Sequence, residues 1–90
     1  IAAVAVSNFT NHLYALAADY CKKENLEFSY LVPLIQEVAN RLVYESPDKL
    51  QTGPAVRKDF STVAKHLEML KDYPKLYKVY EMMTESIAGG

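Results

Sequence analysis

The sequence predicts an all-α domain, a four-helix bundle-like arrangement with one long ordered loop between helices two and three. Apolar residues recur every three or four positions in four separate segments, which is the spacing of one face of a helix. No segment alternates apolar and polar residues over the length of a strand. A chain of 90 residues also has room for only one small domain, so we treat residues 1–90 as a single domain.

The first helix is predicted over residues 2–24. Its apolar stripe consists of Val6, Phe9, Leu13, Leu16 and Tyr20. Residues 1–18 carry no formal charge, so we expect this helix to be central and buried on most sides. We also expect another copy or a further domain to cover part of it. Five polar side chains within the segment argue against a membrane span. Because the chain starts at Ile1 in an apolar run, we expect it to be a segment of a longer protein.

The second helix is predicted over residues 30–45, with Ser29 as a possible N-cap and Pro33 near the first turn, where proline is tolerated. Residues 46–59 follow as a connection that contains two prolines and the first of only three glycines. Loops of this length are uncommon in compact domains and are usually functional or disordered. We expect this one to be ordered.

The third helix is predicted over residues 60–71, behind Asp59 or Ser61 as the residue that caps its first amides. The fourth is predicted over residues 73–87, because Asp72 comes two residues before Pro74 and proline is favoured at the first position of a helix. Both segments contain an apolar stripe that would face a shared core.

The charge balance excludes several classes of partner. Ten Lys and Arg against eleven Asp and Glu give a net charge of −1, which provides no basic field for nucleic acid or anionic lipid. The single cysteine, Cys21, cannot form an intramolecular disulfide, and we predict no metal site. A reducing compartment fits this composition, so we expect a cytoplasmic protein.

No complete catalytic motif is visible, but polar residues recur at helical spacing. Asn8, Asn11 and His12 share one face of the first helix if it is α-helical. Thr62 and His66 are also four residues apart, on the third helix. A pair of this kind is more often an exposed or internally satisfied structural pair than a catalytic one.

The residues around the long loop have two possible roles. Arg57 is either a solvated cation or a bidentate ligand for a carboxylate or phosphate. Asp59 is most simply a helix cap. Tyr73, Tyr77 and Tyr80, on the fourth helix, are typical of core or interface positions before they are typical of proton donors.

Several motifs occur along the chain in a recognisable order: Ser7-Asn8, Pro33-Leu34-Ile35, Asn40, Thr52-Gly53-Pro54, Arg57-x-Asp59, Thr62-Val63 and His66-Leu67. In this order they resemble the C-terminal helical domain of a bacterial family described as NAD(P)-dependent oxidoreductases. The similarity covers residues 3–87, and in that family the domain follows an N-terminal Rossmann domain. The Rossmann domain and the helical domain together are similar to the β-hydroxyacid dehydrogenase, 6-phosphogluconate dehydrogenase and pyrroline-5-carboxylate reductase group. A glycine is common in that family at the position of Lys58.

The resemblance implies that the domain closes the substrate cleft and mediates a homodimer, with NAD(P) bound mainly by the Rossmann domain. The Gly-rich turn that binds a dinucleotide is absent from these residues, so the segment should be inactive alone. His66 and Thr62 are then predicted catalytic residues for reduction of a small anionic molecule, with His66 as the proton donor and Thr62, one turn earlier, as the group that orients it. The predicted substrate-binding residues are Asn8, Asn40, Thr52, Gly53, Arg57 and Asp59. The alternative is a free-standing helical interaction module that docks through the long loop.

Overall fold

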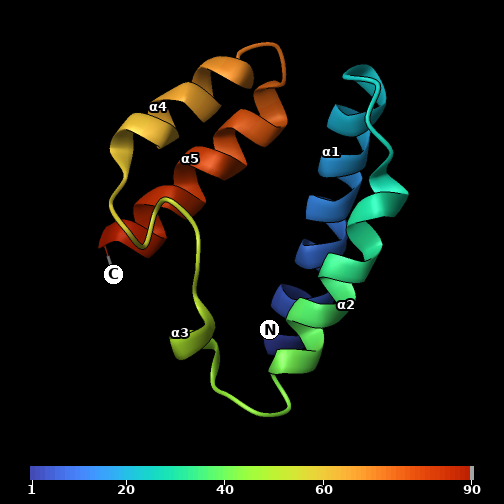
Figure 1. The fold of residues 1–90 in the computed structure, drawn as a ribbon, viewed down its shortest axis with the longest axis vertical. Coiled ribbons are helices and arrows are strands. Elements are labelled where there is room, and N and C mark those ends of the chain that lie inside the picture. The colour runs from blue at the N-terminus through green and yellow to red at the C-terminus, as the bar shows by residue number, and fades with distance from the viewer. Residues whose placement is uncertain (90) are drawn as a thin grey trace. The chain divides into compact units, whose positions relative to one another are not determined.

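The computed structural model describes residues 1–89 and confirms the all-α class, because those residues form helices and no strand. By contacts, the chain divides into two compact units, residues 1–33 and 34–90, which are described in turn. The helical segments are the π-helix η1 (Val4–Phe9), α1 (Thr10–Lys23), the 3₁₀ segment η2 (Phe28–Leu31), α2 (Val32–Arg41), α3 (Pro47–Leu50), α4 (Phe60–Met69) and α5 (Pro74–Gly89) (Figure 1).

The first unit is built on one continuous helix formed by η1 and α1. Its first part is π-helical, a wider turn than the α-helix in which bonds join residues five apart. The side chain of Thr10 follows the same spacing, since its hydroxyl donates to the carbonyl of Ala5 at 3.1 Å. The sequence pattern predicts the helix but not its π-helical start.

The end of α1 is closed by a left-handed cap. Asn25 adopts φ 59°, a conformation that asparagine tolerates better than most residues. The N–H of Leu26 donates to the carbonyl of Cys21 at 2.7 Å, and that of Asn25 to Lys22 at 3.4 Å. These two bonds form a Schellman motif, which reverses the chain so that η2 packs against α1.

The prediction that this first helix is buried on most sides is wrong for the described chain. Cys21 is its one buried residue, whereas Val6 is 75% and Phe9 is 60% exposed. The reason is that η2 is the element of the same unit that packs against α1, and a four-residue segment covers little of its stripe.

The helix α2 ends four residues before its predicted end at residue 45. After Arg41 the backbone tightens, with Leu42, Val43 and Tyr44 each donating to a carbonyl three residues earlier. Such i→i−3 bonds are common at helix ends. The predicted element therefore exists, but its last turn is not α-helical.

The long connection after α2 is ordered and contains the short helix α3, which we did not predict. Ser46 takes an extended conformation immediately before it, Pro47 is its first residue, and Asp48 is acidic in its first turn. Each is a recognised signal of a helix start.

The second unit ends in a helical hairpin of α4 and α5, which lie side by side (Figure 1). Val63 and Leu70 are buried in it, together with Ala55 from the preceding loop. The N–H of Tyr73 donates to the carbonyl of Leu70 at 2.8 Å, closing the turn, and Pro74 then begins α5 as predicted.

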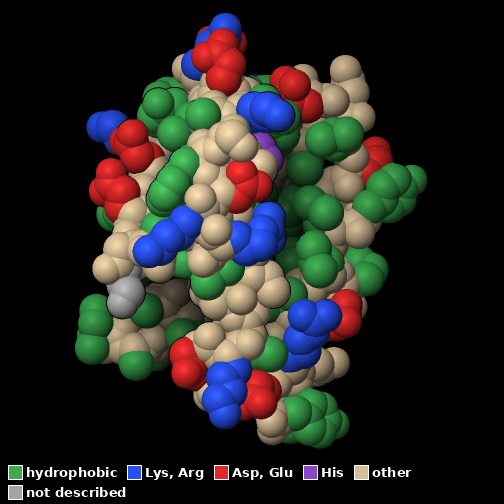
Figure 2. All heavy atoms as spheres, turned by 60° about the vertical axis from the view of Figure 1, so that its left-hand side comes forward, with side chains coloured by type: hydrophobic (Ala, Val, Ile, Leu, Met, Phe, Trp, Pro, Cys, Tyr) green, Lys and Arg blue, Asp and Glu red, His purple; other side chains and the backbone are tan. Residues whose placement is uncertain are grey.

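Many apolar side chains remain at the surface. Figure 2 shows them in green among charged groups on one face of the molecule. Valine, leucine, phenylalanine and tyrosine side chains of both units are among those exposed. Within residues 1–89, no helix has the length and hydropathy needed to cross a membrane.

Candidate functional site

The start of α4 is organised by Asp59. Its Oδ1 accepts hydrogen bonds from the backbone N–H of Thr62 at 3.2 Å and from the hydroxyl of Ser61 at 3.0 Å. Its Oδ2 accepts from the Thr62 hydroxyl at 2.7 Å. Asp59 is therefore the N-cap of α4, as the sequence predicts.

These hydrogen bonds hold the pKa of Asp59 below its ordinary value. The largest cause is the bond from the Thr62 hydroxyl, followed by the Thr62 backbone, the Ser61 hydroxyl and the positive charge of Arg57. Each stabilises the charged form of the carboxylate. Asp59 is thus a fixed negative charge at neutral pH, next to a cation that could bind an anionic ligand.

A tight turn delivers Arg57 and Asp59 to this position. The N–H of Asp59 donates to the carbonyl of Pro54 at 2.9 Å, and that of Lys58 to Ala55 at 3.1 Å. Lys58 adopts φ 55°, in the left-handed region that glycine occupies at no cost. The turn keeps the backbone conformation for which a glycine is suited although a lysine stands there.

Gly53, at the start of the same loop, has φ 101°. An added Cβ would meet no atom within 4 Å, so space does not require glycine at this position. The backbone conformation does, because residues with a side chain rarely adopt it.

The imidazole of His66 is bound by a residue from the neighbouring helix. Its Nδ1 lies 2.7 Å from the hydroxyl oxygen of Tyr80 on α5, and the two rings meet edge to face with centroids 5.6 Å apart. Both side chains are half-buried, and burial raises the pKa of Tyr80. The spacing predicts Thr62 as the group that orients His66, but the Thr62 hydroxyl donates to Asp59 and Tyr80 takes this part.

Tyr80 is the residue that the sequence did not single out for the site. The sequence favours a core or interface position for Tyr80, which lies 14 residues from His66 in sequence. Only the antiparallel packing of α4 and α5 brings the two side chains together, so spacing within one helix could not reveal the pair.

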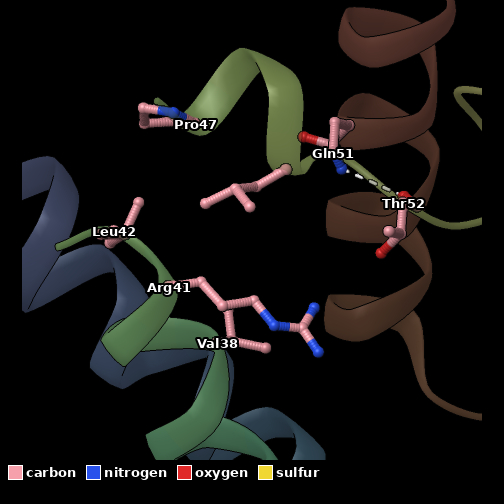
Figure 3. A pocket seen from close by; sticks show the side chains of 7 residues that line it. Val38, Arg41, Leu42, Pro47, Gln51 and Thr52 are labelled. Atoms are coloured by element: carbon pink, nitrogen blue, oxygen red, sulfur yellow. Dashed lines mark hydrogen bonds between the residues drawn. The ribbon is translucent and has the colours of Figure 1, made fainter. Parts of the chain in front are cut away.

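Thr52 lines a separate surface pocket of about 220 Å³ between the end of α2 and α3 (Figure 3). The side chain of Gln51 donates to the Thr52 carbonyl at 3.2 Å. The Arg41 guanidinium also lines this pocket and is paired with Glu37 at 2.8 Å. The other lining residues are Val38, Leu42, Pro47 and Leu50.

The structure therefore brings together some, but not all, of the eight predicted site residues. Asp59 and Thr62 are in direct contact, and Arg57 acts on the same carboxylate. Asn40 is an exposed residue of α2, whereas Asn8 lies in η1, in the other unit. The prediction that all eight face one site remains a prediction. Among residues 1–89, acidic, histidine and cysteine side chains form no group of three that could hold a metal ion.

Comparison with known proteins connects this arrangement to a family. Residues 1–87 match the model of a family described as a domain of unknown function, DUF2520. The chain belongs to this family. No curated protein matches the DUF2520 chain in sequence.

A solved structure is similar over almost the whole DUF2520 chain. It is the crystal structure of a putative NADP oxidoreductase from Bacteroides fragilis, with a TM-score of 0.93 and 46% sequence identity. The match covers 99% of this chain and 34% of that protein. The DUF2520 chain thus spans about one third of the length of its relative.

Proposed function

We propose that these residues are the C-terminal helical part of an NADP-dependent oxidoreductase, which completes a substrate cleft beside a Rossmann domain and contributes to a dimer. The observation that supports this is the 46% identity over 99% of the chain with the Bacteroides fragilis protein. Identity at that level over nearly every residue supports a shared role as well as a shared fold.

The glycines of this chain bear on where NADP would bind. Gly53 stands alone in its loop, and the chain has no Gly-rich turn before a helix. We therefore assign NADP binding to another part of the protein. Bound there, the cofactor would supply a hydride to the carbon of a C=O or C=N group.

The role of this chain is to bind the substrate and supply the proton. His66 donates a proton to the oxygen or nitrogen on which negative charge develops, which is the task of a general acid. Arg57 binds an anionic group of the substrate, and its fork of N–H donors suits a carboxylate or phosphate. Asp59 supports the site by capping α4, and the positive charge of Arg57 contributes to its lowered pKa.

The dimer part of the proposal rests on exposed apolar surface. Val6 and Phe9 project from η1 largely uncovered, next to Val4, which is also exposed. Surfaces of this kind usually mark an interaction site. Val6→Glu should reduce the dimer fraction of the full-length protein in sedimentation experiments, whereas Lys65→Glu, on exposed α4 surface, should not.

The experiment that tests the function compares two chains. The full-length protein should bind NADPH, measured by the change in nicotinamide fluorescence, and the 90-residue segment should not. A full-length protein with no dinucleotide-binding domain before Ile1, or with no NADPH binding, would contradict the proposal. It would favour the free-standing interaction module instead.

A further inference from the structure

The contact between His66 and Tyr80 fixes the imidazole in two ways. The hydrogen bond of 2.7 Å sets the position of Nδ1, and the edge-to-face contact, with an interplanar angle of 87°, sets the plane of the ring. The two residues come from different helices, α4 and α5, so their meeting depends on the packing of the hairpin. Among residues 1–89, the structure shows no hydrogen bond to Nε2, the other ring nitrogen.

The chemistry of the partner determines which nitrogen carries the proton. A carboxylate or a carbonyl can only accept, so it would require a proton on Nδ1 and leave Nε2 of a neutral imidazole bare. A phenol hydroxyl can donate or accept. Because imidazole nitrogen is the stronger base, the favoured bond to a neutral imidazole runs from the Tyr80 hydroxyl to Nδ1, which leaves the proton on Nε2.

The charged imidazole needs only a rotation of the hydroxyl. Both nitrogens of an imidazolium carry protons, so Nδ1–H then donates to the Tyr80 oxygen. We propose that Tyr80 is a positioning residue that holds the proton of the neutral His66 imidazole on Nε2 and accepts from Nδ1–H when the ring is charged, so that His66 presents an Nε2–H donor to its ligand in both states. That the ligand is a reducible substrate rests on the proposed function.

The surroundings of the hydroxyl agree with this role. Burial raises the pKa of Tyr80, so the phenol keeps the proton that it donates. The hydroxyl of Thr62, one turn earlier on α4, is engaged by Asp59 at 2.7 Å and does not compete for the ring.

The test is nitrogen NMR of histidine-labelled full-length protein, at a pH at which imidazole is neutral. His66→Gln assigns the signals of His66. In the wild type we expect a protonated Nε2 and a bare, hydrogen-bonded Nδ1. Tyr80→Phe keeps the ring but removes the hydroxyl, so the ratio of the Nε2–H to the Nδ1–H form should fall about three- to tenfold.

Tyr77→Phe is the matched control. It removes a hydroxyl from the same helix, one turn before Tyr80, and the structure shows no bond between that hydroxyl and His66. It should leave the wild-type pattern unchanged. A wild-type proton on Nδ1, or an unchanged pattern in Tyr80→Phe, would overturn the role of Tyr80.

NADPH binding by the same preparations separates the two proposals. A wild-type protein that binds NADPH but lacks the predicted nitrogen pattern would refute the role of Tyr80 alone. A protein that retains the pattern and binds no NADPH would refute the oxidoreductase function and leave the tautomer assignment standing.

Discussion

The contact between His66 and Tyr80 should contribute a measurable coupling energy to the stability of the α4–α5 hairpin. We consider Tyr80→Phe and Tyr80→Leu, each alone and with His66→Ala. The hydrogen bond of 2.7 Å is half-buried, and water can replace part of it, so its coupling should be about 0.5–1 kcal/mol. The edge-to-face contact adds about 0.5–1 kcal/mol. The double-mutant cycle with Tyr80→Phe should therefore give a coupling energy of about 0.5–1 kcal/mol, from the hydrogen bond alone. The cycle with Tyr80→Leu removes both interactions and should give about 1–2 kcal/mol.

Urea unfolding followed by circular dichroism measures each free energy of unfolding. For a domain of this size, Tyr80→Phe should also lower the midpoint of thermal unfolding by about 2–8 °C. Tyr77→Phe combined with His66→Ala serves as the control, and the effects of these two substitutions on the free energy of unfolding should be additive. A coupling energy below about 0.3 kcal/mol in the Tyr80→Leu cycle would refute the reasoning, because the ring and hydroxyl would then make no net interaction with His66.

Three further predictions concern the loop before α4. Hydrogen bonds, chiefly from the Thr62 hydroxyl, hold the pKa of Asp59 in the folded protein below its ordinary value. The contribution of the carboxylate to the free energy of unfolding should therefore be complete above about pH 5 and be lost as the pH falls through the unfolded and then the folded pKa. Asp59→Asn should cap α4 as well and show a smaller loss of stability in acid unfolding. Lys58→Gly should raise the free energy of unfolding by up to about 1 kcal/mol in urea titrations, because glycine relieves the cost of φ 55°; a clear decrease would contradict this. Gly53→Ala should lower it by about 1–3 kcal/mol through φ 101° alone, since its Cβ meets no atom, and an unchanged urea midpoint would exclude backbone strain there.

The sequence predicts the positions of the long helices well because their signals are local. The cap at Asp59 and the proline at Pro74 mark helix starts through the chemistry of a few neighbouring atoms. The start of α3 has the same kind of signal in Ser46, Pro47 and Asp48 and could have been found. The prediction treated this stretch as a loop because two prolines and a glycine dominate it.

Burial and side-chain partners could not be predicted in the same way, since they depend on what packs against each helix. The absence of formal charge over residues 1–18 indicates that something covers this part of the first helix, but in the described chain Val6 and Phe9 remain exposed. Similarly, the spacing of Thr62 and His66 is correct for one helical face, yet the hydrogen bond to His66 comes from Tyr80 on another helix. A spacing rule describes one helix at a time and contains no information on its neighbours.

The π-helical start of the first helix affects how the helix tolerates a change in length. The hydrogen bonds of η1 join residues five apart, whereas those of α1 join residues four apart, so a turn of η1 contains about one residue more than a turn of α1. A deletion of one residue within Val4–Phe9 would let the remaining residues form α-helical bonds. The helix would survive, and Ile1 would keep nearly its present direction around the axis relative to Thr10–Lys23, because the deletion removes the one residue by which the π turn exceeds an α turn. The π-helical turn therefore absorbs one residue of length without changing the direction in which the start of the helix points.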